Sequence, residues 1–278
     1  MKKLFAVVSL VLITFSYAQN SRFIYEVSMK KDSTNKSEIK TELAYLDIGN
    51  QHSNFYAANR IKRDSVMQIS FQSKGAIRPD RTVMENLRLD INYTIEKDLS
   101  NQKVIYKDRI ARDLYYYEDD RKLDWKILPE TATIGEYKAQ KATVDFGGRH
   151  WTAWFTQDIP FMDGPYKFHG LPGLIIKIED QKGDYSFLLK ETKKLAELPI
   201  LRNMGNLIKV KRKDYLAQVE KYKKDPASFF NQSGMRMGPP MHGGSGGGTP
   251  PNAAEMRKRM EERVKEEIKN YNNPIELN

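Results

Sequence analysis

The chain contains no cysteine among its 278 residues, which excludes disulfide bonds, thiolate metal sites and thiol nucleophiles. It also lacks two common signatures of catalytic and nucleotide-binding sites, H-E-x-x-H and the Gly-Lys-Ser/Thr of a phosphate-binding loop, and its one G-x-S-x-G string, residues 243–247, lies in a glycine run with no apolar strand pattern before it. After the N-terminal segment, no apolar run reaches the roughly eighteen residues that a transmembrane helix needs. These absences favour a protein that is not an enzyme. A pair of acid–base carboxylates has no sequence signature, however, so an uncharacterised hydrolase stays as an alternative.

The first 18 residues have the pattern of a secretory signal peptide. Lys2 and Lys3 precede an apolar run, and the small residues Ser16 and Ala18 stand where a signal peptidase reads the chain. The run of about a dozen apolar residues is too short to cross a bilayer of roughly 30 Å as a helix. We therefore expect cleavage after Ala18 and export to the periplasm or the outer membrane.

The formal net charge is +10, with acidic and basic residues interleaved along most of the chain. Such a surface suits an anionic lipopolysaccharide, a membrane face or an acidic partner. Nucleic acid is not expected as a partner of an exported protein.

Short alternations of apolar and polar residues recur from residue 22 to about residue 212, which is typical of half-buried strands. Gly147-Gly148 and Lys182-Gly183 lie between such runs and predict two hairpins. Strands spaced this closely leave no room for crossover helices, so we expect antiparallel pairing. The sequence predicts a mainly β fold: an antiparallel curved sheet or half-barrel with C-terminal helices.

The composition divides the chain after the signal peptide into three parts. Residues 19–230 form the predicted β domain, which includes a helical segment near 213–225. Residues 231–251 are rich in glycine, proline and methionine and indicate a flexible loop. Residues 252–278 predict an amphipathic helix and a tail.

Several short motifs resemble the GLPGLI family of exported Bacteroidetes proteins. They are "LDWKI", "AWFT", "DIP", "GPY" and "GLPGLI", in order between Leu123 and Ile178, and "NNPIEL", which ends at Leu277. The resemblance implies an exported, mainly β protein of uncharacterised function, often found alongside TonB-dependent outer-membrane receptors. It supplies no catalytic residues. Some relatives have a cysteine where this chain has Ala139, so a thiol role elsewhere in the family is absent here.

The most conspicuous motif, "GPYKFHGLPGLIIKIED", could form either a structural corner of the chain or part of a ligand-binding cleft. Gly170 and Gly173 bracket a Leu-Pro pair with the chemistry of a tight turn, which alone explains these residues. In the alternative, the turn amides and His169 lie at the mouth of a cleft with His150 and Trp151, where they would hold an anionic or peptide ligand.

The two histidines also allow a metal hypothesis. If the strands bring His150 and His169 together near Asp158 or Asp163, these residues could share a zinc ion. Histidines at strand ends more often form ordinary hydrogen bonds, which favours the simpler interpretation.

Aromatic residues suggest a platform for carbohydrate or peptide. Alternation places Trp151 and Phe155 on one face of their strand and Trp154 on the other, so at least one face is expected to be core. The residues considered for the platform are Tyr115, Tyr116, Tyr117, Trp125, Trp151 and Trp154.

Met235, Met237, Met241 and His242 are the candidate metal ligands of the glycine-rich loop. Thioether sulfur and imidazole suit Cu(I), and side chains among glycines and prolines have little core to fill. Cu(I) is therefore the cofactor that the sequence favours. A segment that docks onto a partner protein is the alternative.

The leading hypothesis is a non-catalytic periplasmic or outer-membrane-associated binding protein. It would serve a TonB-dependent receptor system and handle a metal, a peptide or a protein segment. An interaction-only subunit of an envelope assembly is the second hypothesis, and the hydrolase is the third.

Overall fold

A computed structural model describes residues 20–73, 77, 79–111, 113–203, 206–226, 228–229 and 253–278. The predicted signal peptide and the methionine-rich loop lie outside these residues. Within them, no helix has both the length and the apolar character needed to cross a membrane.

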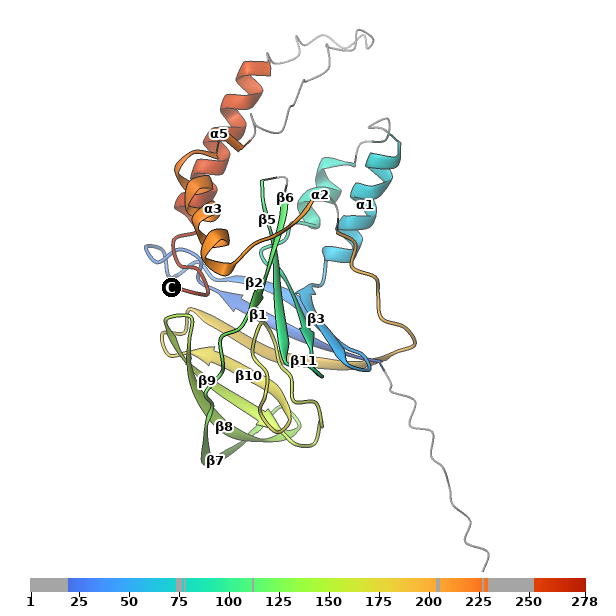
Figure 1. Ribbon diagram of the computed structural model, residues 1–278, viewed down its shortest axis with the longest axis vertical. Coiled ribbons are helices and arrows are strands. Elements are labelled where there is room, and N and C mark those ends of the chain that lie inside the picture. The colour runs from blue at the N-terminus through green and yellow to red at the C-terminus, as the bar shows by residue number, and fades with distance from the viewer. Residues whose placement is uncertain are drawn as a thin grey trace, which may run out of the picture.

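The described residues form one sheet of twelve strands in the order β12-β6-β5-β4-β3-β2-β1-β11-β10-β9-β8-β7 (Figure 1). The strands are β1 (Asn20–Met29), β2 (Lys40–Ile48), β3 (His52–Ala57), β4 (Thr94–Asp98), β5 (Lys103–Ile110), β6 (Asp113–Asp119), β7 (Lys126–Ile134), β8 (Tyr137–Phe146), β9 (Arg149–Thr156), β10 (Leu174–Asp180), β11 (Tyr185–Leu195) and β12 (Leu207–Lys209). The mainly β prediction is confirmed, and the sheet is open rather than closed into a barrel. The expectation of antiparallel pairing is wrong for one pair, because β12 returns to lie parallel to β6.

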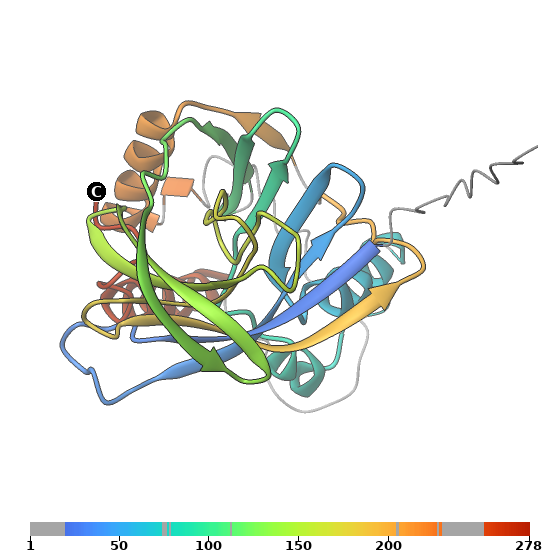
Figure 2. The same cartoon turned by 90° about the horizontal axis from the view of Figure 1, so that it is seen from below.

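The connection between β6 and β7 explains why the sheet is curved. These strands occupy the second and the twelfth positions in the sheet, ten steps apart. At about 4.8 Å per step, a flat sheet would separate them by roughly 48 Å. The chain from Asp119 to Lys126 spans at most about 25 Å, at roughly 3.5 Å per residue. The sheet therefore curls into a bowl, which Figure 2 shows from below.

The core lies on the concave side of this bowl, and β1 at its centre shows the pattern. Phe23, Tyr25, Val27 and Met29 alternate along the strand and are buried. Each large apolar side chain buried in this way contributes roughly 1.5–3 kcal/mol. The Tyr25 hydroxyl donates a hydrogen bond of 2.7 Å to the carbonyl of Ile175 on β10, which joins two strands that are separated in the sheet by β11.

Helices lie outside the sheet (Figure 1). α1 (Arg60–Gln72) and α2 (Arg81–Asn86) precede β4, where the sequence pattern predicts no helix. α3 (Arg212–Lys224) lies where a helical segment was expected near 213–225. α5 (Ala253–Lys269) is followed by a tail that returns to the sheet.

Candidate functional site

The segment between β9 and β10, residues 157–173, folds into the bowl, and we call it the plug. Figure 2 shows it as the yellow-green chain surrounded by the strands. Its Phe168 ring packs against Trp151 of β9 with ring centroids 4.8 Å apart. Its Phe161 ring meets Phe23 of β1 at 5.7 Å. The interior of the bowl is therefore occupied by the chain itself.

A buried lysine fastens the plug to β4. The Nζ atom of Lys97 donates to the Asp163 carboxylate, to the Gly164 carbonyl at 2.6 Å and to the Phe168 carbonyl at 3.2 Å. An ammonium group has three protons, so all of them are used. Burial lowers the pKa of Lys97, and the Asp163 charge opposes this shift. The fully bonded ammonium acts as a structural pin rather than as a free nucleophile.

A second buried lysine, Lys167, binds two carboxylates and an aromatic cage. Its Nζ lies 2.7 Å from Asp119 and 2.6 Å from Glu276. The ring of Tyr106 lies beneath the same nitrogen at 4.7 Å, and the rings of Tyr117 and Tyr166 lie at 5.1 and 5.3 Å. Cation–π attraction strengthens when the cation has lost its water, as here. The protein's own Lys167 therefore occupies the aromatic cage.

The C-terminal tail, residues 272–278, closes the network, and we call it the strap. Burial acts to raise the pKa of Glu276, but the charges of Lys167 and Arg121 outweigh it and hold the pKa at about 2. Arg149 of β9 donates to Asn273 at 2.6 Å and to Asp180 at 2.8 Å. In the "NNPIEL" motif, Glu276 thus neutralises the buried Lys167, while Asn273 supplies a neutral acceptor to Arg149, whose charge Asp180 balances.

The glycine-rich corner has a structural explanation in this fold. A Cβ atom on Gly173 would lie 2.0 Å from the Thr156 carbonyl oxygen, and the φ angle of Gly173 is +146°. Gly170 has a φ angle of +90°. Both positions require glycine, since an L side chain rarely adopts these angles. The Trp125 indole donates a 2.8 Å hydrogen bond to the His169 carbonyl and holds the corner against the chain that leads into β7.

The predicted cleft residues do not form one site. His169 is partly buried in the plug, and its Nδ1 lies 3.1 Å from the Lys167 carbonyl, to which it can only donate. Burial, followed by the charge of Lys97, lowers the pKa of His169. His150 is 41% exposed, with its Nδ1 2.7 Å from Asp145. Trp151 is fully buried, and its indole donates to the Phe146 carbonyl.

The aromatic candidates of β9 differ in burial. Phe155, like Trp151, belongs to the core, whereas Trp154 on the opposite face is half-buried. Within the described residues, no group of three or more His, Asp and Glu side chains could hold a metal ion, so these residues do not form the shared zinc site. Met235, Met237, Met241 and His242 lie outside the described residues.

An open hollow of about 610 Å³ lies at the rim of the bowl, at the β7–β8 hairpin. Gln140 of β8 pairs with Phe155 of β9 and with Thr131 of β7, so these three side chains point to one face. Phe155 shares that face with Trp151, four residues earlier in β9, so the hollow is on the concave side, beside the plug. It is lined by Thr131, Ala132, Thr133, Lys138, Ala139, Gln140, Phe155, Gln157 and Asp158.

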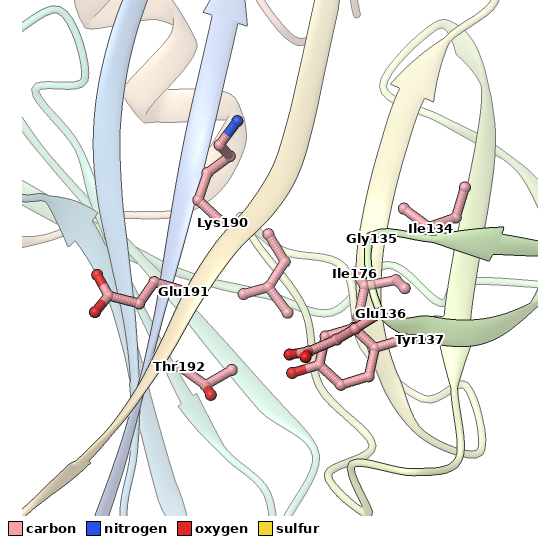
Figure 3. A pocket seen from close by; sticks show the side chains of 9 residues that line it. Ile134, Gly135, Glu136, Tyr137, Ile176, Lys190, Glu191 and Thr192 are labelled. Atoms are coloured by element: carbon pink, nitrogen blue, oxygen red, sulfur yellow. The ribbon is translucent and has the colours of Figure 1, made fainter.

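A smaller hollow of about 180 Å³ lies between the tip of the same hairpin and β11 (Figure 3). Figure 3 shows Tyr137 and Glu136 on one side of it and Thr192 on the other. Ile134, Ile176 and Leu189 are the aliphatic residues of its lining.

Sequence reasoning missed the residues of the larger hollow. Thr131 and Thr133 alternate in a strand that the motif "LDWKI" predicts only in part. Pro129 was the available signal, because proline within a strand indicates an edge. The hollow also needs Gln157 and Asp158, which only the folded plug brings beside β7.

Comparisons with known proteins find a family with a similar segment and solved structures with a similar fold. Residues 148–177, which comprise all of β9, the plug and the first half of β10, match a Bacteroidetes-associated family described as "Protein of unknown function (Porph_ging)". No curated protein matches the chain. Two structures of PNGF-II, in the P21 and C2 space groups, are each 17% identical, with a TM-score of 0.51 over 74% of this chain. The match spans 34% of the PNGF-II chain, so this chain is similar in fold to part of a longer protein.

Proposed function

We propose that this chain is a non-catalytic binding protein of the cell envelope, periplasmic or outer-membrane-associated, that serves a TonB-dependent receptor system. One observation carries the proposal: the bowl is filled by its own plug, while an open hollow of about 610 Å³ lies on its rim. A binding protein needs an accessible concave surface of about this size.

The state of the buried charges supports a binding role over catalysis. Lys97 gives all its protons to plug acceptors, and Lys167 is bonded to Asp119, Glu276 and the Tyr117 hydroxyl. Catalytic groups are more commonly held with an open position for the substrate. The charges of this core are used to hold the plug and the strap in place.

The partner is proposed from the likeness of the motifs to the GLPGLI family. "GLPGLI" contributes the plug corner and the first residues of β10, and "NNPIEL" forms most of the strap. These motifs explain the fold rather than the binding surface. The rim beside β7 is therefore where we place contact with the receptor.

The experiment is site-specific photocrosslinking in the native cell envelope. A photoreactive residue replaces Lys138 in the hollow, and a matched variant carries it at Lys103 on β5, near the other end of the sheet. We expect an adduct with a TonB-dependent receptor from position 138 and none from position 103. Adducts of equal yield at both positions, or an adduct that contains no receptor, would exclude the proposal. A different envelope protein captured only at position 138 would favour an interaction-only subunit.

Copper is a second candidate ligand because three methionines and a histidine fall within residues 235–242 of a chain that has no cysteine. Soft sulfur ligands select Cu(I) where thiolates are absent. In this form of the proposal, the protein delivers cuprous ion to the receptor through the methionine-rich loop.

A further inference from the structure

The hairpin turn between β7 and β8 determines which backbone groups of β7 are free. Ile134 pairs with Tyr137 across the two residues Gly135 and Glu136, and Gly135 has a φ angle of +60°. In such a hairpin the pair next to the turn is hydrogen-bonded, and bonded pairs then alternate along the strands. Ala132 is therefore bonded to β8, whereas Thr131 and Thr133 turn their N–H and C=O groups away from it.

β7 is also the last strand of the sheet. Its neighbour on one side is β8, and no other strand of the described residues lies on the other side. Two N–H and C=O pairs, at Thr131 and Thr133, are therefore open. They are spaced by about 6.8 Å, the repeat of an antiparallel strand.

The first half of the same edge is protected against pairing. Ile127 pairs with Ala142 and Thr131 with Gln140, so four steps along β7 match two steps along β8, and the ladder is interrupted. Pro129 lies in this interruption and has no N–H to donate. Irregular strands and prolines are usual means of preventing edge association. This protection of the β7 edge ends at Thr131, the first residue of β7 that lines the hollow.

The side chains beside the open groups are polar and charged. Lys138 and Asp158 both line the hollow, and neither forms an ion pair within the described part of the chain. Thr131, Thr133 and Gln157 add hydroxyl and amide groups, while Phe155 and Ala139 are the buried apolar residues of the lining. The hollow can therefore take one polar side chain of a ligand whose backbone follows the edge.

From this geometry we infer that an extended segment of a partner protein adds to β7 as a further strand. Its backbone pairs with Thr131 and Thr133, and one of its hydrogen-bonding side chains enters the hollow between Lys138 and Asp158. Only a polypeptide backbone repeats donors and acceptors at this spacing, so the ligand class is an extended peptide rather than a sugar or a lipid. The inference rests on the proposed binding function and specifies how the same site would work.

Peptides that bind the mature chain are selected from a phage-displayed library of random nonapeptides. The selected peptides are then synthesised and serve as the probes. The test variant is Thr133→Pro, which removes the outward N–H but leaves the pairs with β8 at Ala132 and Ile134. The matched control is Thr133→Val, which keeps the N–H and loses only the hydroxyl group. We expect Thr133→Pro to weaken peptide binding by roughly tenfold or more and Thr133→Val to change it by less than about threefold, as loss of a backbone hydrogen bond implies.

A second measurement separates strand addition from contact through side chains alone. Single N-methyl groups are placed at each position of a selected peptide. Loss of binding at every second position supports the added strand, because alternate N–H groups face β7. Failure to select any peptide, equal binding to Thr133→Pro or an N-methyl profile without this alternation would overturn the inference. If any of these results is found but the receptor still forms an adduct at position 138, the proposed function stands. Only the addition of a strand to β7 is then excluded.

Discussion

Lys97 and Asp163 form an ion pair in which 1% of the lysine side chain and none of the aspartate side chain is exposed. The two residues are 66 positions apart and join β4 to the plug. Breaking such a pair leaves one charge buried without its partner. The protein is therefore stable only when the plug lies where Asp163 can pair with Lys97.

Replacing Lys97 with methionine should lower the free energy of unfolding by about 3–5 kcal/mol, because the Asp163 charge stays buried and two plug carbonyls lose their donor. Urea unfolding followed by tryptophan fluorescence measures this change. Lys103→Met is the matched control, since Lys103 pairs with Glu118 at the surface at 3.6 Å and should contribute less than about 1 kcal/mol. Equal effects of the two changes would show that Lys97 does not pin the plug.

Glu276→Gln should destabilise the protein in a pH-dependent manner. The pKa of Glu276 falls from 4.5 to about 2 in the folded state. A folded-state pKa below the unfolded value gives stability that is present at neutral pH and is lost as the pH falls from about 5 to about 2. The shift corresponds to roughly 3 kcal/mol. Urea unfolding at pH 7, 4 and 2.5 should show the gap between wild type and variant shrinking, whereas a gap independent of pH would contradict the role of the Glu276 charge.

Gly173→Ala should destabilise the protein by more than about 2 kcal/mol, since its Cβ would meet the Thr156 carbonyl oxygen and its φ angle is unfavourable for alanine. Gly135→Ala is the control. Gly135 also has a positive φ angle but no atom near its Cβ position, so the expected cost is about 1 kcal/mol. Thermal unfolding of both variants provides the comparison, and similar midpoints would mean that the corner can relax.

These examples also show what the sequence could predict. The hairpins at Gly147-Gly148 and Lys182-Gly183 are encoded locally, because turn chemistry and strand alternation lie within a few residues of each other. The glycines and the proline near Gly170 likewise indicate a turn from local chemistry, although the sequence leaves a binding cleft there as the alternative. The curl of the sheet, in contrast, follows from the order of its strands, which no local pattern contains.

The candidate site was harder to predict because its residues meet only after folding. Lys97 appears in the sequence as one more charged residue of a strand, and nothing near it indicates Asp163. Trp151 was considered for a platform, although alternation alone could not say which face of β9 the plug would cover. The polar side chains at Thr131 and Asp158 come together only because the plug starts where β9 ends.

His169 should be neutral at pH 7, with its proton on Nδ1. That nitrogen faces the Lys167 carbonyl, and burial together with the Lys97 charge lowers the pKa of His169 below its ordinary value of 6.5. Nitrogen-15 NMR of the imidazole should show a protonated Nδ1 and an unprotonated Nε2 down to a pH below 6.5. A titration midpoint at 6.5 would show that His169 is more exposed than its position in the plug implies, and one above 6.5 would show that the Asp163 charge outweighs burial. Because protonation favours the unfolded chain, this group should reduce stability as the pH falls below 6.5.

The copper proposal predicts tight, stoichiometric Cu(I) binding by the mature chain, residues 19–278, in competition with a cuprous chelator. Changing Met235, Met237, Met241 and His242 to alanine should abolish this binding, because thioether and imidazole groups are its proposed ligands. Met162→Ala is the matched control: Met162 is an exposed methionine of the plug, and its loss should leave the affinity unchanged. Equal binding by all three proteins would place any copper site outside the methionine-rich loop. If none of them competes with the chelator, copper is excluded as a cofactor, and the loop is then better explained as a docking segment.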